Sequence, residues 1–264
     1  MKFKSLGKKL TSIICIMLAV SILVVILASL GLAKNHSDSI MQEKSVAGLA
    51  LLKNELNDQI ERLRNTFSYL ESSGIAGEML MNGSTEIMAP TWEIHKGTEN
   101  DFAAFAKKDG TIVWQTENFI LSDHDVSKGL DGMITSGIVV DTAAGLTLQY
   151  LTPISMYNTI VGTAVVGMYL TESSYLDELT ALTGAEVTLF RGTTRYATTV
   201  MNADGTRAIG TEMSAKVAQK VIDQGLPYAG TADILGQNHY VDYEPMFDIN
   251  GNIVGAFFAG YSSA

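Results

Sequence analysis

The chain has 264 residues, of which 47% are hydrophobic and 17% charged, and its formal net charge is −10. This acidic surplus argues against a nucleic-acid-binding protein, which needs extra lysine and arginine to neutralise phosphates. The single cysteine, Cys15, rules out a disulfide framework within the chain and a cysteine-based metal site. The length is enough for one large domain or for two modules of roughly 100 residues each.

The first 33 residues predict a membrane anchor. Four lysines come first, namely Lys2, Lys4, Lys8 and Lys9. Residues 10–33 carry no charge and are rich in Leu, Ile and Val, and at about 1.5 Å per helical residue they can cross a bilayer core of about 30 Å. Because lysines collect on the cytoplasmic side of membrane spans, we expect a cytoplasmic N-terminus in the cell membrane and a periplasmic or extracellular location for residues 34–264.

A cleaved signal peptide is the alternative interpretation of this segment. Gly31-Leu32-Ala33 could serve as its cleavage site, because small residues lie at both ends of the triplet. Signal peptides usually have apolar regions of about 7–15 residues, which is shorter than the run found here. The sequence therefore favours an uncleaved anchor.

Residues 34–74 predict a long amphipathic stalk helix. No proline or glycine occurs between Leu49 and Ser73, and Gly74 is a suitable end. Apolar residues recur at spacings of three and four, at Leu49, Leu52, Leu56, Ile60, Leu63, Phe67 and Leu70. This stripe either packs on a domain of the same chain or forms a dimeric stalk, and one helix can do both through different faces. We expect a homodimer through this helix.

Residues 75–170 predict a first module with an antiparallel sheet. Residues 102–106 and 111–115 flank Lys108-Asp109-Gly110 and are typical of a β-hairpin. Residues 145–150 and 161–169 predict two further strands, and residues 125–131 a short helix between them.

Residues 171–264 repeat the same order, after a linking helix at residues 172–182. Gly162 and Gly167 are five residues apart, as are Gly255 and Gly260, and the two pairs lie 93 residues apart. Two similar modules are the simplest explanation. The chain stops at Ala264 without a second membrane span or a cytoplasmic signalling part, so an alternative hypothesis is a stand-alone anchored accessory protein that associates with a full receptor.

Several short motifs lie between residues 183 and 260. They are Thr183-Gly184-Ala185, Thr198-Thr199-Val200, Asp204-Gly205-Thr206-Arg207-Ala208-Ile209-Gly210-Thr211, Gly225-Leu226-Pro227-Tyr228 and Tyr243-Glu244-Pro245. In this order they resemble the membrane-proximal part of double Cache ectodomains (Cache 3/Cache 2 fusion type), which occur mostly in methyl-accepting chemotaxis receptors. The resemblance implies an α+β fold, with a long transmembrane and stalk helix followed by two PAS-like Cache modules with antiparallel sheets. It also implies a sensor that binds a small molecule, uses no cofactor and is not an enzyme.

Arg195 is the first candidate for contact with the ligand, because a guanidinium can grip a carboxylate with two hydrogen bonds. The segment that begins at Arg195-Tyr196 is similar to the Arg-Tyr-x-His segment of citrate and C4-dicarboxylate sensor kinases, but Thr198 occupies the histidine position. A threonine adds no charge, so the pattern favours a smaller anion or a polar neutral ligand over a polycarboxylate.

Three tyrosines, Tyr228, Tyr240 and Tyr243, complete the proposed site with Arg195 and Thr198. Tyr240 and Tyr243 are three residues apart, so on one strand they face opposite sides and at most one of them faces the ligand, unless a bulge intervenes. An alternative site in the first module would use Trp92, Trp114 and Tyr150 as an aromatic wall.

Catalytic and metal sites have little support in the sequence. The four histidines are scattered, and Asp123-His124-Asp125 is more typical of a polar loop than of a metal site. The motifs of serine hydrolases and of phosphate-binding loops are absent. We therefore expect no catalytic residues, no metal and no cofactor.

Overall fold

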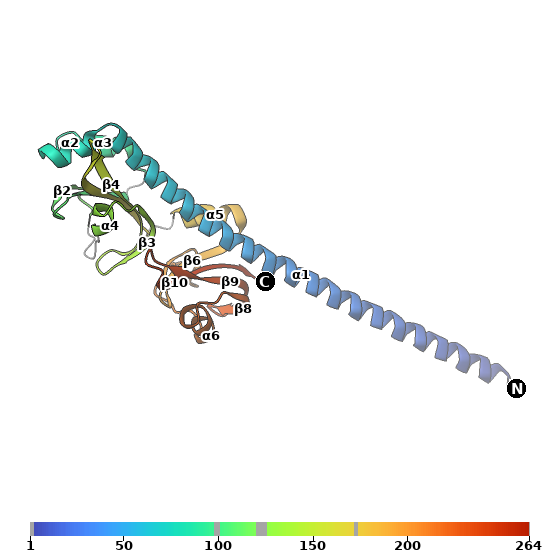
Figure 1. The fold of residues 1–264 in the computed structure, drawn as a ribbon. Coiled ribbons are helices and arrows are strands. Elements are labelled where there is room, and N and C mark those ends of the chain that lie inside the picture. The colour runs from blue at the N-terminus through green and yellow to red at the C-terminus, as the bar shows by residue number, and fades with distance from the viewer. Residues whose placement is uncertain (1–2, 98–100, 120–125, 172–173, 264) are drawn as a thin grey trace.

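The computed structural model describes residues 3–97, 101–119, 126–171 and 174–263, with only the backbone described for residues 3–15. One helix, α1 (Phe3–Ser72), runs past two five-stranded antiparallel sheets that lie one after the other along its C-terminal half (Figure 1). The predicted α+β fold with a long first helix and two sheet modules is confirmed. The helix stops just before Gly74, which has a left-handed φ of 74°.

The N-terminal part of α1 projects away from both modules (Figure 1). From Ile16 onward it contains a stretch that is long and apolar enough to cross a membrane, and none of that stretch is buried against the described chain. Exposed leucine, isoleucine and valine side chains are stable in a bilayer but not in water. This portion of the helix is therefore the candidate anchor.

The apolar stripe of α1 is buried against both modules. Leu52, Leu63 and Leu70 are fully buried, and they share one core cluster with Phe105 of the first module and Leu189 of the second. The interpretation that the stripe packs on its own chain is thus correct. A homodimer through α1 would have to use another face of the helix, and dimerisation stays a prediction.

The distal module, which lies at the C-terminal end of α1, begins with two short helices, α2 (Ile75–Asn82) and α3 (Met88–His95). Its strands are β1 (Asp101–Lys107), β2 (Ile112–Gln115), β3 (Thr135–Asp141), β4 (Gly145–Met156) and β5 (Thr159–Tyr169), in the order β2-β1-β5-β4-β3. The predicted hairpin is confirmed as β1 and β2. The predicted helix at 125–131 is the single turn α4 (Ser127–Leu130), and Asp125 lies outside the described residues. The edge strand β3 was not predicted from the sequence, because its apolar run, Ile138-Val139-Val140, is only three residues long.

The proximal module, which begins with α5, has the same sheet topology, shifted by five strands. Its elements are α5 (Ser174–Thr183), β6 (Glu186–Arg191), β7 (Thr194–Thr198), α6 (Ala215–Ala218), the π-helix η1 (Gln219–Asp223), β8 (Tyr228–Ile234), β9 (Gln237–Phe247) and β10 (Ile253–Ser262). The order β7-β6-β10-β9-β8 places β10 at the centre, as β5 is in the distal sheet. The repeated glycines lie on these two central strands. A Cβ at Gly162 would lie 2.3 Å from the carbonyl oxygen of Ala106, and one at Gly255 would lie 1.8 Å from that of Phe190. Each glycine therefore allows a neighbouring backbone to approach closely.

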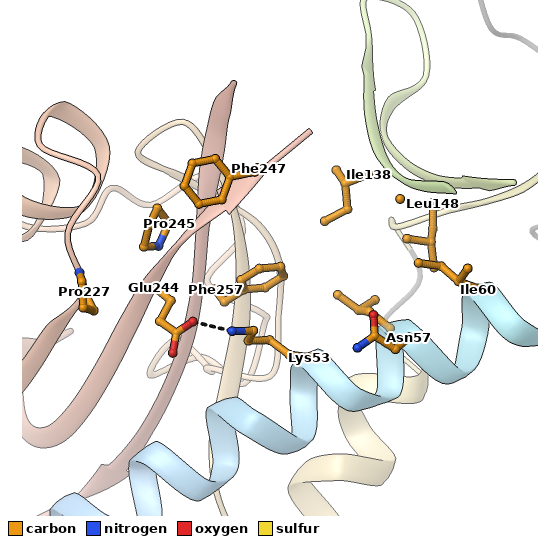
Figure 2. A pocket seen from close by; sticks show the side chains of 12 residues that line it. Lys53, Asn57, Ile60, Ile138, Leu148, Pro227, Glu244, Pro245, Phe247 and Phe257 are labelled. Atoms are coloured by element: carbon orange, nitrogen blue, oxygen red, sulfur yellow. Dashed lines mark hydrogen bonds and ion pairs between the residues drawn. The ribbon is translucent and has the colours of Figure 1, made fainter. Parts of the chain in front are cut away.

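The proximal module meets α1 through polar contacts as well as the core. Gly48 lets the helix approach the sheet, because a Cβ there would lie 3.1 Å from Cβ of Ala185. The Lys53 ammonium donates to Glu244 of β9 at 2.5 Å, and both side chains are partly exposed (Figure 2). Asp242 is buried two residues earlier on β9. Burial raises the pKa of Asp242 to about 6; the neighbouring Glu244 adds to the rise and Lys53 opposes it.

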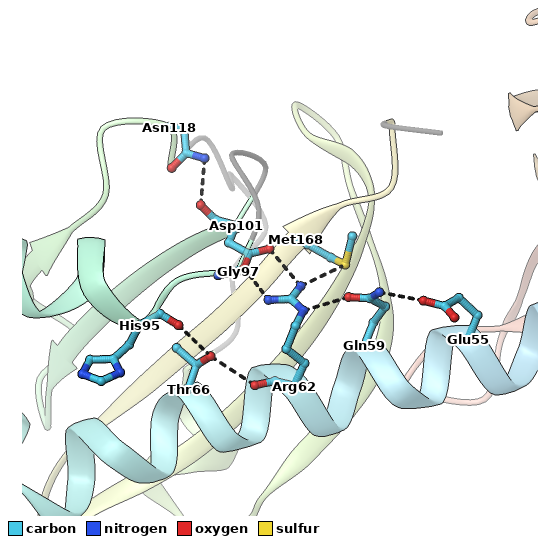
Figure 3. Close-up of polar contacts among 9 residues, drawn as sticks. All are labelled: Glu55, Gln59, Arg62, Thr66, His95, Gly97, Asp101, Asn118 and Met168. Carbon is cyan, nitrogen blue, oxygen red and sulfur yellow. Dashed lines mark hydrogen bonds and ion pairs between the residues drawn. The ribbon is translucent and has the colours of Figure 1, made fainter. Parts of the chain in front are cut away.

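The distal module is fastened to α1 by a buried ion pair. Arg62 donates to both carboxylate oxygens of Asp101, at 2.5 and 3.1 Å, and the Gly97 amide donates to the same carboxylate at 2.9 Å (Figure 3). The Arg62 Nε donates to Gln59 at 2.8 Å, which orients the guanidinium. The Asp101 side chain is only 1% exposed, so its charge depends on these partners.

Removing the guanidinium of Arg62 should destabilise the protein strongly. Arg62→Ala leaves the Asp101 carboxylate buried without its cation, and we expect the free energy of unfolding to fall by about 3 kcal/mol. Arg64→Ala is the matched control, because Arg64 pairs with Glu61 on the exposed face of α1 and should cost less than about 0.5 kcal/mol. Denaturant unfolding of the full chain in detergent measures both. Equal effects of the two substitutions would contradict a buried clamp.

Asp242 should make the protein less stable as the pH rises. Its folded pKa of about 6 lies above the ordinary 3.8, so the folded state holds the proton more tightly than the unfolded state. The resulting stabilisation is fully present below pH 3.8 and is lost as the pH rises through about 6. The loss is at most about 3 kcal/mol, from roughly two pKa units at about 1.4 kcal/mol each.

Asp242→Asn removes this titration. Relative to the wild type, the variant should gain stability between pH 4 and pH 7, which thermal unfolding at a series of pH values measures. Asp58→Asn, on the exposed face of α1, is the control and should follow the wild-type profile. A constant difference between Asp242→Asn and wild type across this range would show that Asp242 does not titrate there.

Candidate functional site

Arg195 lies on β7 and points away from α1. It faces a separate core cluster of the proximal module, which includes Phe190, Tyr243 and Phe258. It is 3% exposed. Its guanidinium carbon lies 5.2 Å from the ring centre of Phe190 and 5.9 Å from that of Phe258. Its Nη1 donates to the Thr211 hydroxyl at 2.8 Å. The cation is thus held between two aromatic rings, with one neutral hydrogen-bond acceptor.

The charge of Arg195 has no matching carboxylate in the described part of the chain. No acidic side chain there lies within ion-pair distance of the guanidinium, and its buried Nε has no hydrogen-bond partner. Glu186 lies on the same side of the sheet, but its carboxylate is 3.0 Å from the His239 ring instead. Burial lowers the pKa of Arg195, while Tyr243 and Glu186 oppose the shift. A buried cation of this kind favours an anion beside it.

Two of the predicted tyrosines share this cluster. Tyr228 of β8 and Tyr243 of β9 are direct cross-strand partners, with ring centres 6.2 Å apart in an edge-on arrangement. Tyr243 is 1% exposed, and its ring centre lies 4.8 Å from that of Phe258. Burial raises the pKa of Tyr243 to about 12, although Arg195 opposes the rise. The sheet therefore brings Arg195, Tyr228 and Tyr243 to one face.

A β-bulge in β7 decides which residues join Arg195. Leu189 pairs with Ala197 but Phe190 pairs with Arg195, so Tyr196 is an extra residue. Thr198 pairs with Thr188 and consequently lies on the same face as Arg195. Its hydroxyl is 2.6 Å from that of Thr188 and also accepts from the Val200 amide at 3.1 Å. Thr198 therefore lies near the site with its hydroxyl already engaged.

Tyr240 lies on the other face of the sheet. Its hydroxyl donates to Asp38 of α1, which places the side chain against the helix. The spacing of three between Tyr240 and Tyr243 had indicated that they face opposite sides, and this is how they lie. The structure thus places four of the five predicted residues on one face and separates Tyr240 from them.

The three aromatic residues of the alternative site in the distal module belong to one core cluster, but they are not all neighbours in the sheet. Trp92 and Trp114 pack edge-on with ring centres 6.4 Å apart, beside a hollow of about 450 Å³ that Glu93 and Lys96 also line. Tyr150 lies on β4, which β1 and β5 separate from the strand of Trp114. Its ring packs 6.3 Å from that of Phe67 on α1. Tyr150 is therefore a core residue of the helix-covered face.

Two lysines near the site were not predicted from the sequence. Lys216 and Lys220 lie on α6 and η1, and their ammonium groups are 5.4 and 5.7 Å from the centre of the Tyr228 ring. They are four residues apart and follow Ser214, whose hydroxyl caps α6. That spacing after a capping serine could have indicated two cations on one helical face. Together with Arg195 they gather positive charge around Tyr228 and Tyr243.

The cover of this face consists of the segment between β7 and β8. Val200, Ala208, Met213, Val217 and Val221 are buried in the same cluster as Phe190 and Tyr243. The five residues of η1 form a π-helix, a conformation that is rare and often found at functional sites. Reaching Arg195 from solvent requires movement of this cover.

Metal ligands do not gather anywhere in the described ranges. No group of three or more His, Cys, Asp or Glu residues there could hold a metal ion. The sequence Asp123-His124-Asp125 lies outside the described residues.

A family model described as single Cache domain 3 matches residues 167–264, which correspond to the proximal module. No curated protein is significantly similar to the chain in sequence. Several solved structures share its fold. The periplasmic domain of Vibrio cholerae LuxQ is 15% identical and covers 83% of this chain and 100% of its own, with a TM-score of 0.54.

Two further structures extend the comparison. The sensor domain of the Vibrio cholerae histidine kinase DctB is 8% identical and covers 86% of this chain and 99% of its own, with a TM-score of 0.53. The ligand-binding domain of the Campylobacter jejuni chemoreceptor Tlp3, solved with L-norvaline, is 11% identical and covers 87% of this chain and 92% of its own, with a TM-score of 0.52. At these identities the comparison shows the fold alone. The chain thus has the fold of Cache-type, PAS-like sensor domains from chemoreceptors and histidine kinases, and its proximal module is similar to a single Cache domain 3.

Proposed function

We propose that the protein is a membrane-anchored extracytoplasmic sensor, of the kind found in chemoreceptors, that binds a small carboxylate in its proximal module. The observation that carries the proposal is the buried guanidinium of Arg195, which has no carboxylate partner in the described structure. Lysines at the N-terminal end of α1 favour a cytoplasmic N-terminus, which supports an extracytoplasmic location of both modules. The double Cache arrangement remains part of the proposal.

The energetics of Arg195 favour a bound anion. Contacts between a cation and aromatic rings contribute about 0.5–2 kcal/mol, and one neutral hydrogen bond contributes about 1 kcal/mol. Removing a charge from water costs several kcal/mol, so these contacts do not balance the burial of the guanidinium. A carboxylate would supply both the missing charge and an acceptor for the unpartnered Nε.

The surrounding charges agree with an anionic ligand. Four of the 18 basic residues are the lysines before residue 10. The remainder of the chain therefore contains 14 basic and 28 acidic residues. Against this acidic background, Lys216 and Lys220 lie at the cover of the Arg195 site. Cations at an entrance raise the local concentration of anions and speed their association.

Strand β10 can carry a signal from the site to α1. Phe258 faces Arg195, whereas the next residue, Ala259, faces α1, where a Cβ at Gly48 would lie 3.4 Å from it. A ligand that binds two positions of β10 with unequal affinity would shift the strand against the helix. α1 continues from this contact into the apolar segment, so the shift would reach the membrane.

We assign the homodimer contact to the face of α1 that the modules leave open. Val46, Ala47 and Leu51 are exposed there, while the apolar stripe is enclosed by the modules. Two such helices side by side would carry a relative movement across the membrane.

Arg195→Met separates a ligand-binding role from a structural one. The substitution replaces an unbalanced buried charge with an apolar side chain of similar length, so in the absence of ligand we expect stability to rise by about 1–3 kcal/mol. Carboxylates should bind the wild type, and their affinity for the variant should fall at least about 30-fold, because a charge-assisted pair contributes about 2 kcal/mol or more. Isothermal titration and thermal unfolding of the full chain in nanodiscs measure both effects.

The titration panel comprises acetate, lactate, succinate, citrate and L-norvaline. Arg191→Met is the matched control, because Arg191 is exposed at the end of β6 and should change neither quantity. The proposal fails if none of the panel binds the wild type and Arg195→Met lowers the unfolding temperature, since Arg195 would then have a structural role.

A further inference from the structure

A groove of about 590 Å³ lies between the two modules, with α1 as its floor (Figure 2). It is separate from the Arg195 cluster, which lies on the opposite face of the proximal sheet. Small-molecule sites in proteins usually have volumes of about 300–1,000 Å³ and often lie at domain interfaces. The groove therefore has the size and the position of a ligand site.

Most of the groove is apolar. Each of its three sides contributes large hydrophobic side chains: Leu56 and Ile60 from α1, Ile138 and Leu148 from the distal module, and Phe247 and Phe257 from the proximal module. Figure 2 shows the labelled members of this set converging on the same space. Phe247 is 49% exposed, and part of its ring is open to the groove. An apolar body would be stabilised here by burial.

The charged side chains that line the groove are Lys53 and Glu244, which form an ion pair at its polar end. The Lys53 ammonium lies 2.5 Å from one Glu244 oxygen and so neutralises that carboxylate. The other Glu244 oxygen has no hydrogen-bond partner in the part of the chain that the structure describes. Asp242, two residues earlier on the same face of β9, does not line the groove but interacts electrostatically with Glu244. The free Glu244 oxygen can accept from an ammonium group, and the nearby Asp242 carboxylate adds negative potential at this end of the groove.

The walls of the groove are held together by contacts between the modules. The Ile249 amide, in the turn between β9 and β10, donates to the Ile138 carbonyl of β3 at 3.0 Å. Lys128 of α4 donates to Asn250 of the same turn at 2.6 Å. A molecule in the groove would consequently touch α1 and both modules at once, so its binding would depend on their relative position.

We propose that this groove binds a small amine, with its ammonium group at the free oxygen of Glu244 and an apolar body between Phe247, Phe257 and Leu148. The site is distinct from the carboxylate site at Arg195. Occupation of the groove would fix the two modules relative to α1.

The probe is 2-phenylethylamine, and 3-phenylpropionate has a similar apolar body with the opposite charge. Isothermal titration of the full chain in nanodiscs should give the amine a Kd below about 1 mM. The carboxylate is tested in Arg195→Met, which removes the other proposed anion site, and should bind at least about tenfold more weakly than the amine. Failure of the amine to bind up to about 10 mM, or equal binding of the two probes in this variant, overturns the proposal.

Two pairs of variants locate the binding. Asn57→Trp extends into the groove from an exposed helix position and should abolish amine binding, whereas Asn54→Trp, which lies outside the groove lining, should leave it unchanged. Glu244→Gln should weaken the amine at least about tenfold, and the exposed Glu178→Gln should have no effect. Unchanged binding to Asn57→Trp overturns the proposal.

The two proposed sites can fail independently. If Arg195→Met binds the amine normally but carboxylates bind neither this variant nor the wild type, the groove stands and the carboxylate site falls. If carboxylates bind the wild type and the amine does not, the reverse holds.

Discussion

The buried face of α1 is the constraint on which the rest of the structure depends. Leu49 to Leu70 supply one continuous apolar stripe, and the inner faces of two separate sheets close over it to form a single core cluster. Neither sheet could cover its inner face without the helix, because an isolated sheet with one apolar face is not stable in water. Both modules are therefore packed on the same helix, and a movement of either module changes its position relative to α1.

The two modules form different ion pairs with α1. The distal module is held by Arg62 and Asp101, a doubly hydrogen-bonded pair whose carboxylate is almost fully enclosed. The proximal module uses Lys53 and Glu244, a partly exposed pair that water weakens, next to Asp242, which titrates near pH 6. The ion pair of the distal module is thus the better enclosed of the two, and the ion pair of the proximal module is the more open to water and to changes in pH. In the proximal module the central strand β10 touches both the helix and the Arg195 cluster.

Each sheet has one face for the helix and one face for its own cover, and in our proposal this division separates stability from recognition. In the proximal module the helix face carries Tyr240 and the apolar core, while the outer face carries the buried cation, its aromatic neighbours and the lysines of α6 and η1. A cation enclosed by aromatic rings is poorly compensated, and that imbalance is what a ligand can relieve. The amine site that we propose in the groove has the opposite polarity, since Glu244 on the helix face keeps one carboxylate oxygen without a hydrogen-bond partner in the described part of the chain.

The sequence alone determined the periodic features of this protein. The spacing of three and four in α1, the Asp-Gly hairpin and the recurring glycine pairs are local signals, and each appears in the structure where it was expected. Tertiary structure alone decided which residues meet. The bulge at Tyr196 places Arg195 and Thr198 on one face, although their spacing along a regular strand would separate them. The stripe of α1 packs on its own modules because two sheets present matching apolar faces, a fact that no single segment encodes. Lys216, Lys220 and the groove between the modules depend likewise on contacts between segments far apart in the chain, which the order of residues does not specify.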